Sequence, residues 1–178
     1  MGKRTLASRA LLSASTALLC LWGTAAQAAT DNGFAVYLGP VGSNDSSVYG
    51  SSHGFAIGVD AQFVVSDSWS LNPYLLISSE TTDRSFDVVN GEGGLQARYW
   101  MGPWFVGGQF LFHDMLLKQG GTVGTSDYGP ALGLAAGWEG ANHWSVVLEA
   151  NALEKGSTYS TSGNNRSDVL LLVGYRWY

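Results

Sequence analysis

Apolar and polar residues alternate along most of this chain with a period of two, the pattern of β-strands whose two faces meet different surroundings. In segment 55–63, for example, Phe55, Ile57 and Phe63 share one face, whereas Asp60 lies on the other. The alternation predicts strands at about 34–38, 55–63, 69–77, 93–101, 104–112, 128–138, 144–152 and 167–177. Eight consecutive segments of this kind predict an all-β protein.

The connections between these segments alternate between short turns and longer polar stretches. Short turns are predicted near residues 67, 102 and 141. Stretches rich in Gly, Ser, Thr, Asn and Asp, which are typical of exposed loops, occupy roughly 40–52, 79–91, 114–126 and 154–166. This order favours an eight-stranded antiparallel up-and-down barrel with its short turns at one end and its long loops at the other.

The two faces of the strands distinguish a membrane barrel from a soluble one. One face carries most of the Phe, Leu, Val and Trp residues, and the other carries Gly, Ala and polar residues, although Val147, Leu170 and Leu172 also fall there. Eight strands enclose a narrow lumen, so small and polar residues fit inside and bulky apolar groups fit against lipid. The pattern favours a transmembrane β-barrel. A soluble periplasmic ligand-binding barrel, which buries its apolar face, is the less favoured alternative.

Tryptophan placement indicates where the strands leave a membrane. Six of the seven tryptophans lie beside the short turns or at the chain end: Trp69, Trp100, Trp104, Trp138, Trp144 and Trp177. Amphipathic rings gather at the two boundaries of a bilayer. We therefore expect these six residues to form a membrane girdle at the turn side of the barrel.

The N-terminus has the features of a cleaved signal peptide. Lys3, Arg4 and Arg9 precede an apolar run that ends near Trp22 and is too short to span a membrane as a helix. Ala26-Gln27-Ala28 matches a small-x-small cleavage site, so residues 1–28 are predicted to be removed and residues 29–178 to form the barrel.

The mature chain is acidic and lacks cysteine. The only cysteine of the full sequence, Cys20, belongs to the signal segment, so disulfides are excluded in the mature chain despite export. Removing the three basic residues of that segment leaves six Lys and Arg against 14 Asp and Glu, a net charge near −8. This charge disfavours nucleic acid as a partner. No mature segment is long and apolar enough for a membrane helix, so a membrane location requires a closed barrel.

The signal segment, the alternating strands and the ending Gly174-Tyr175-Arg176-Trp177-Tyr178 together resemble the small eight-stranded outer-membrane β-barrel proteins of Gram-negative bacteria. The resemblance implies an integral protein of the cell outer membrane that contacts outer-membrane lipids. It also implies recognition of the C-terminal strand by the barrel-assembly machinery. Proteins of this group usually end in an aromatic residue with another two positions earlier; Tyr175 and Trp177 have that spacing, but Tyr178 follows them.

One motif suggests catalysis, and we regard it as weak. His143-Trp144-Ser145 is similar to the His-x-Ser of outer-membrane lipid A deacylases, and Glu149 is placed to orient the imidazole. However, His143 falls in a short turn and Ser145 is predicted to face the lumen. A turn residue beside a girdle tryptophan is the simpler interpretation.

The residues of the polar face fall into two groups, one in the lumen and one towards its outer mouth. Neither group predicts a metal site or a cofactor. Charges in a narrow lumen must pair or be hydrated, which suggests a plug formed by Glu92, Gln96, Arg98, Gln109, Glu149 and Arg176. His113, Asp127 and Asp168, together with Glu92, are placed towards the outer mouth, where a solvated rim is a simpler interpretation than a metal site.

The sequence therefore favours a non-enzymatic outer-membrane barrel with a structural or surface-interaction role. The predicted loops carry the aromatic residues Tyr49, Phe86 and Tyr159, which are candidates for contact with an extracellular ligand. A lipid A-modifying hydrolase or acyltransferase is the alternative, because this fold carries several unrelated functions.

Overall fold

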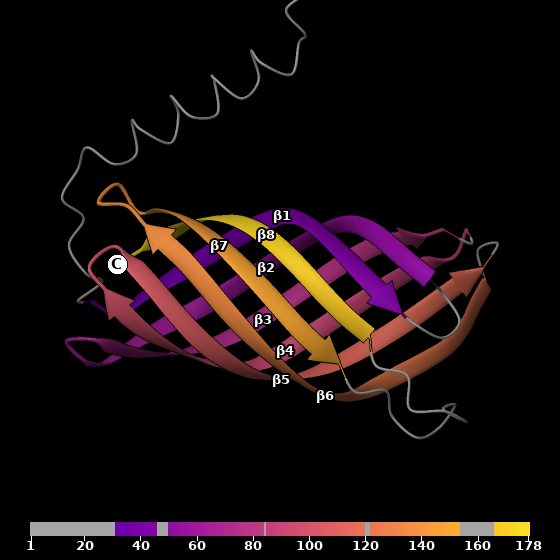
Figure 1. Cartoon of the computed structure of the whole chain (residues 1–178), viewed down its shortest axis with the longest axis horizontal. Coiled ribbons are helices and arrows are strands. Elements are labelled where there is room, and N and C mark those ends of the chain that lie inside the picture. Colours follow the sequence, from indigo (N-terminus) through magenta and orange to yellow (C-terminus); the bar gives the residue numbers. More distant parts are fainter. Residues whose placement is uncertain (1–30, 46–49, 84, 120–121, 154–165) are drawn as a thin grey trace, which may run out of the picture.

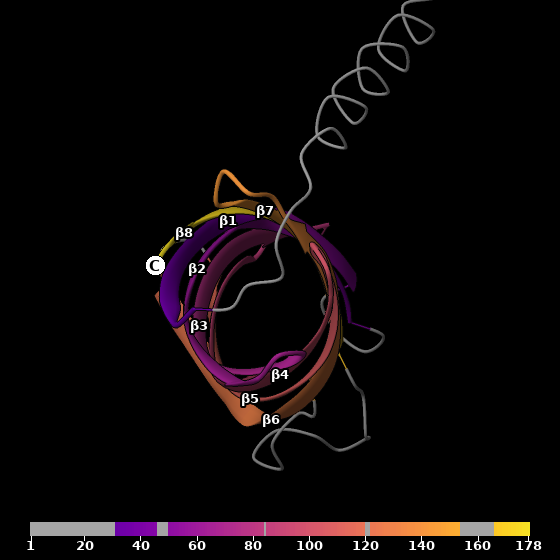
Figure 2. The same cartoon turned by 90° about the vertical axis from the view of Figure 1, so that its left-hand side faces the viewer.

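The computed structural model describes residues 31–45, 50–83, 85–119, 122–153 and 166–178 as one closed antiparallel barrel (Figures 1 and 2). Each strand pairs with its neighbours in sequence, and β8 pairs with β1 to close the ring. The predicted eight-stranded up-and-down architecture is thus confirmed. The strands are β1 (Gly33–Asp45), β2 (Gly50–Ser66), β3 (Trp69–Thr82), β4 (Asp87–Met101), β5 (Trp104–Gln119), β6 (Thr122–Glu139), β7 (Trp144–Leu153) and β8 (Arg166–Trp177).

The short connections 67–68, 102–103 and 140–143 lie at the barrel end that also holds the start of β1 and the end of β8, and we call it the turn end. Gly102 adopts a φ of 65°, which glycine reaches without steric cost, and Pro103 then stiffens the connection from β4 to β5. The opposite end is called the far end. The predicted signal peptide, residues 1–28, lies outside the described residues.

The strands continue well beyond the segments that the sequence predicts. β2, β5 and β6 contain 17, 16 and 18 residues, whereas a tilted strand crosses a bilayer in about 9–11. The prediction of long loops over 40–52, 79–91 and 114–126 is wrong, because strand pairing runs through most of each stretch. These stretches are rich in Ser, Thr and Asn, yet they remain in strands because their backbones pair with the neighbouring strand. The fourth predicted loop lies mostly outside the described residues.

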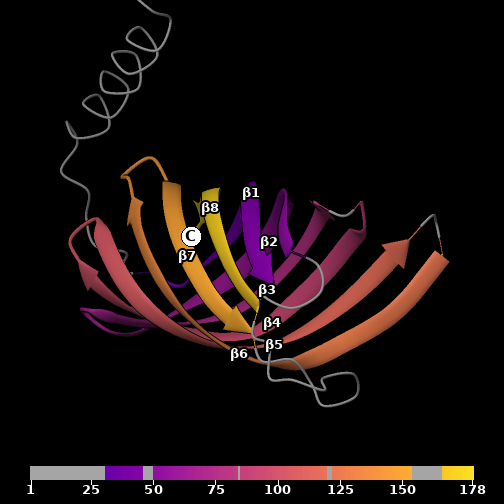
Figure 3. The same cartoon turned by 45° about the vertical axis from the view of Figure 1, so that its right-hand side comes forward.

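The wall of the barrel is uneven at the far end. Within the described residues, β7 and β8 contain 10 and 12 residues, and β6 pairs with β7 from Ala131 to Glu139. Figure 3 shows β5 and β6 extending past the ends of β7 and β8. Of the described residues, those that extend beyond a membrane-sized section belong mainly to β2 to β6.

The two faces have opposite polarity to those of a soluble protein. Outward residues such as Leu134, Leu75 and Phe112 are 71%, 62% and 61% exposed. Inward residues include Asp60 and Arg98, which are buried. Among the described residues, no helix is long and apolar enough to cross a membrane.

Candidate functional site in the barrel lumen

The turn-end half of the lumen contains an ion cluster formed by Tyr37, Asp60, Arg98, Glu139 and Arg176. The Asp60 carboxylate lies between two guanidinium groups, with Oδ2 at 2.6 Å from Arg98 Nη2 and Oδ1 at 2.8 Å from Arg176 Nη1. The Tyr37 hydroxyl donates to Asp60 Oδ2 at 2.9 Å and accepts from Arg176 Nη2 at 2.9 Å. Arg176 Nε also contacts Glu139 Oε2 at 3.0 Å. Two cations thus meet two anions, which is how buried charges become tolerable.

Tyr178 connects the chain end to this turn-end cluster. Its hydroxyl donates to Glu139, and its ring lies 5.3 Å from the His143 ring between centroids. Burial and the neighbouring Glu139 carboxylate both raise the pKa of the Tyr178 phenol, so the phenol stays a donor. Trp177 and Tyr175 instead lie on the outward side of β8, with rings 4.9 Å apart.

A chain of side-chain amides continues from Arg98 towards the far end. Arg98 Nε donates to Gln96 Oε1, and Gln96 Nε2 donates to Gln109 Oε1 at 2.6 Å. Gln109 Nε2 donates to Asn151 Oδ1, and Asn151 Nδ2 donates to Glu92 Oε2 at 3.1 Å. A guanidinium can only donate, so Arg98 alone fixes one orientation for all three amides: each presents its oxygen towards Arg98 and its NH2 group towards Glu92.

Other neutral donors also bind the carboxylates in the middle of the lumen. Tyr74 donates to Glu149 Oε2 at 3.0 Å, and Asn90 donates to Glu92 Oε1 at 2.8 Å. These bonds replace part of the hydration that each carboxylate would have in water.

The far-end half of the lumen contains a second ion cluster, formed by Ser43, Ser52, Glu80, Arg166 and Asp168. Arg166 contacts Glu80 Oε1 at 2.6 Å and Asp168 Oδ1 at 2.8 Å, and Arg166 Nη2 donates to Ser43 Oγ at 2.8 Å. Ser43 and Ser52 both donate to Glu80 Oε2. Because these residues come from β8, β1, β2 and β3, the far-end cluster links four neighbouring strands of the wall.

The six predicted plug residues, Glu92, Gln96, Arg98, Gln109, Glu149 and Arg176, are all buried and all belong to the networks above. The predicted outer-mouth rim is wrong for His113 and Asp168, which are 3% and 1% exposed. The strands continue past both residues, so they lie inside the lumen rather than at its mouth. Asp127 belongs to β6, but its side chain lies outside the described part.

The weak catalytic candidates are not assembled into a triad. His143, in the β6–β7 turn, packs its ring against Tyr175 and Tyr178, whereas Ser145 is buried on the inward side of β7. Glu149 accepts from Tyr74 deeper in the lumen. A serine nucleophile needs an imidazole within hydrogen-bond reach. Among the described residues, no hydrogen bond joins His143 to Ser145, and no group of three His, Asp or Glu residues is arranged to hold a metal ion.

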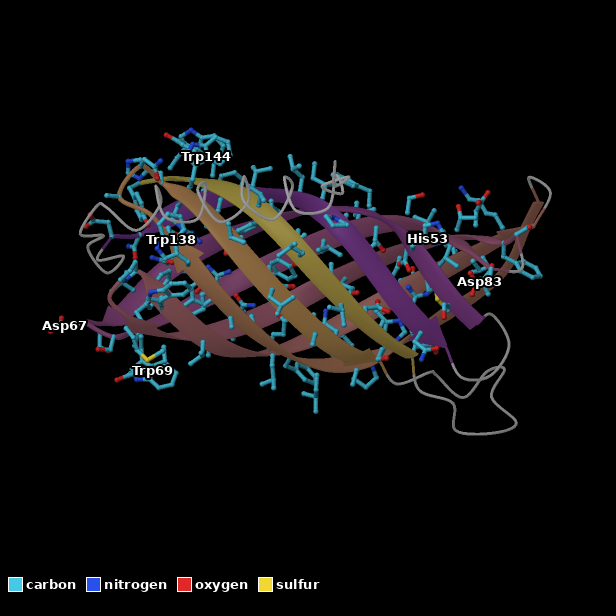
Figure 4. All side chains as sticks on the ribbon, turned by 45° about the horizontal axis from the view of Figure 1, so that its top comes forward. His53, Asp67, Trp69, Asp83, Trp138 and Trp144 are labelled. Atoms are coloured by element: carbon cyan, nitrogen blue, oxygen red, sulfur yellow. The ribbon has the colours of Figure 1, made fainter. Side chains whose placement is uncertain are left out.

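Four of the six predicted girdle tryptophans, Trp69, Trp104, Trp144 and Trp177, project outward and are about half exposed. Figure 4 shows Trp69 and Trp144 at the same end of the barrel as Asp67. Trp100 is not a girdle residue: it is 4% exposed, donates to Ser70 Oγ at 2.9 Å and packs against Phe105. It occupies an inward position of β4, and position on the strand outweighs proximity to the turn. Trp138 is outward by position but only 9% exposed.

The sequence pattern does not identify several residues as members of the ion clusters. Glu80 and Arg166 fall in stretches predicted as loops, and Glu139 was assigned to a turn. The alternation places Asp60 on the polar face but does not identify it as the partner of Arg98 and Arg176. Glu80 has no hydropathy signal in the sequence, because its neighbours Ser79 and Thr81 are polar as well; the alternation of buried and exposed residues that continues to Thr82 appears only in the structure.

Glycine on the inward side of β6 allows the amide chain to cross that strand. A Cβ added to Gly133 would lie 2.0 Å from Asn151 Oδ1 and 2.8 Å from Gln109 Nε2. We expect Gly133→Ala to destabilise the barrel by about 1–3 kcal/mol, because the new methyl group displaces both amides. Urea unfolding in detergent, followed by tryptophan fluorescence, measures this.

Gly42→Ala is the matched control, since nothing lies within 4 Å of a Cβ at Gly42. Equal unfolding midpoints for the two variants would contradict the role of Gly133.

No protein-family model matches this chain, and no curated protein matches it by sequence. Solved structures do resemble it. The attachment invasion locus protein Ail of Yersinia pestis has a TM-score of 0.60 at 11% identity, over 83% of this chain and 100% of Ail. Neisserial surface protein A has a TM-score of 0.57 at 13% identity, over 81% and 97%. The outer membrane enzyme PagL has a TM-score of 0.55 at 10% identity, over 79% and 98%. The chain therefore has the fold of small eight-stranded outer-membrane β-barrel proteins.

Proposed function

We propose that this protein is an integral outer-membrane β-barrel with a structural or surface-interaction role, and that side chains plug its lumen. The observation that carries the proposal is the inverted polarity: three arginines and their acidic partners are buried, whereas Leu, Phe and Ile side chains cover the outside. A soluble ligand-binding barrel needs the opposite arrangement. The proposal does not extend to lipid A modification, because the candidate catalytic residues lie apart.

The outward surface supports a membrane location by its dimensions. On β5, the outward positions from Trp104 to Phe112 are apolar or glycine, and Asp114 follows them. A stretch of this length matches the about 9–11 residues with which a tilted strand crosses a bilayer. The segments beyond it expose His53 on β2 and Asp83 just after β3 (Figure 4). These segments are the surface that we assign to contact with an extracellular partner.

Similar structures include a surface protein and an attachment protein, which agrees with such a role. Ail has also been solved with the heparin analogue sucrose octasulfate, at a TM-score of 0.54 to this chain. A polyanion is not the partner proposed for this protein, because its mature chain is acidic.

Cysteine labelling tests both the location and the orientation, since the mature chain contains no cysteine of its own. We expect His53→Cys to react with a membrane-impermeant maleimide on intact cells, because it lies at the far end. Asp67→Cys, at the turn end, is expected to react only after the outer membrane is permeabilised. Recovery of the labelled protein in a soluble periplasmic fraction would refute the membrane location, and the reverse labelling pattern would refute the orientation.

We also propose that the assembly machinery recognises the outward pair Tyr175 and Trp177. In the His53→Cys background, removal of Trp177 and Tyr178 is expected to abolish surface labelling, because the last outward aromatic residue and a paired position of β8 are lost. Removal of Tyr178 alone is expected to leave most of the labelling. Normal labelling of the two-residue deletion would refute this assignment.

The plug predicts that the barrel does not conduct ions as a pore does. Eight strands leave a lumen that side chains fill, and an ion cluster occupies each half of it. We expect purified protein in planar bilayers to show no stable large conductance, while a porin of about 16 strands provides the positive control. Reproducible steps of nanosiemens size would make transport the leading function.

A further inference from the structure

An apolar groove of about 530 Å³ lies on the outward face at the turn end, from Met101 at the end of β4 across to β8. Ala136 on β6 forms its floor, and the neighbouring outward residues Val106 and Leu148 pair with Ala136 from either side. Trp104 and Leu171 line it further out. The groove exists because a methyl group occupies a position whose neighbours on both adjacent strands carry larger side chains.

Trp138 forms a fixed wall of this groove. It is 9% exposed, whereas the outward Trp104 and Trp144 are 48% and 49% exposed. The Trp138 ring lies so close to Gly140 that an added Cβ would meet Cη2 at 2.5 Å. The ring therefore packs along the barrel surface instead of projecting from it.

We propose that this groove binds one acyl chain of a zwitterionic phospholipid from the periplasmic leaflet of the outer membrane. The inference rests on the proposed function, because the groove is continuous with the surface assigned to lipid. All the side chains that line it are those of Met, Trp, Phe, Val, Leu, Ala or Gly, so a hydrocarbon chain loses no hydrogen bond on entering. Its volume lies in the range of about 300–1,000 Å³ that is usual for small-molecule sites.

The charges at the turn end favour a zwitterionic headgroup over an anionic one. Among the described residues, Arg98 and Arg176 are the only Lys or Arg residues in this half of the barrel, and both are buried in the lumen. Asp67 is exposed in the β2–β3 turn. An anionic phosphate would find no surface cation here, whereas an ammonium group can lie against the faces of Trp104 or Trp144.

Native mass spectrometry of the detergent-purified barrel tests the site, with added phosphatidylethanolamine, phosphatidylglycerol or lipid A as probes. We expect wild type to retain one phosphatidylethanolamine. Ala136→Phe, which fills the groove, is expected to bind it about tenfold more weakly. Gly108→Phe adds the same ring to the outward face of β5 where nothing lies within 4 Å of a Cβ and outside the groove, so it should bind like wild type. Heat-dependent gel mobility verifies that each variant is folded.

Equal retention by wild type and Ala136→Phe would overturn the site, as would an equal loss in Gly108→Phe. Preferential retention of phosphatidylglycerol or lipid A would overturn the assigned occupant. The outcome is separable from the proposed function, because surface labelling at position 53 reports the membrane location independently. A correctly labelled barrel that retains no phospholipid contradicts this inference alone.

Discussion

Asp60→Ala is expected to destabilise the barrel by about 3–5 kcal/mol, the usual cost of removing one partner from a buried ion pair. The reason is that Asp60 is the carboxylate shared by Arg98 and Arg176, and both guanidinium groups are fully buried. Their remaining partners, Gln96, Tyr37 and Glu139, cannot balance two positive charges. Urea unfolding in detergent micelles, followed by tryptophan fluorescence, measures the change.

Asp67→Ala removes the same side chain from an exposed position in the β2–β3 turn and serves as the control. It is expected to leave the free energy of unfolding nearly unchanged. If Asp60→Ala unfolds at the same urea concentration as this control, the turn-end cluster does not contribute to stability.

Leu134→Arg is expected to destabilise the folded barrel in a bilayer by about 2–4 kcal/mol, because it places a charge on the lipid-facing surface. Leu134 is 71% exposed and lies on β6 opposite Gly108 and Ala150, well inside the apolar section of the wall. Folding into phospholipid vesicles, followed by heat-dependent gel mobility, measures the effect.

Ser51→Arg introduces the same charge on the outward side of β2, next to the far end of that strand, where the surface is polar. It is expected to fold as wild type does. Unimpaired folding of Leu134→Arg would mean that β6 has its inward and outward faces reversed with respect to lipid.

The sequence predicted the barrel well where its two faces differ most. Between the membrane boundaries, one face meets lipid and the other a polar lumen, so the period of two is clear in segments such as 55–63. Beyond that section both faces are polar, as the outward Ser79 and the inward Glu80 show, and the contrast that marks a strand disappears. The strand itself continues, because backbone pairing between β3 and β4 extends to Thr81 and Asp87. Hydropathy alone cannot report that pairing.

The lumen was predictable in its composition but not in its contacts. Position along a strand indicates that Asp60, Arg98 and Arg176 point inward, and it also places Trp100 inside although it adjoins a turn. Which of these side chains meet depends on strand register and barrel closure. Arg176 and Asp60 are separated by 116 positions in the chain, and only the pairing of β8 with β1 brings them together. No local pattern encodes such a contact.

The single orientation of the three amides between Arg98 and Glu92 has an electrical consequence. Protons move along hydrogen bonds only where each group can accept one proton and release another, as water and carboxylic acids do. A side-chain amide offers N–H donors and a carbonyl acceptor but does not exchange them readily. Gln96, Gln109 and Asn151 therefore interrupt this route, and the chain acts as an insulator. A membrane could hold many copies of such a barrel without a proton leak through this network.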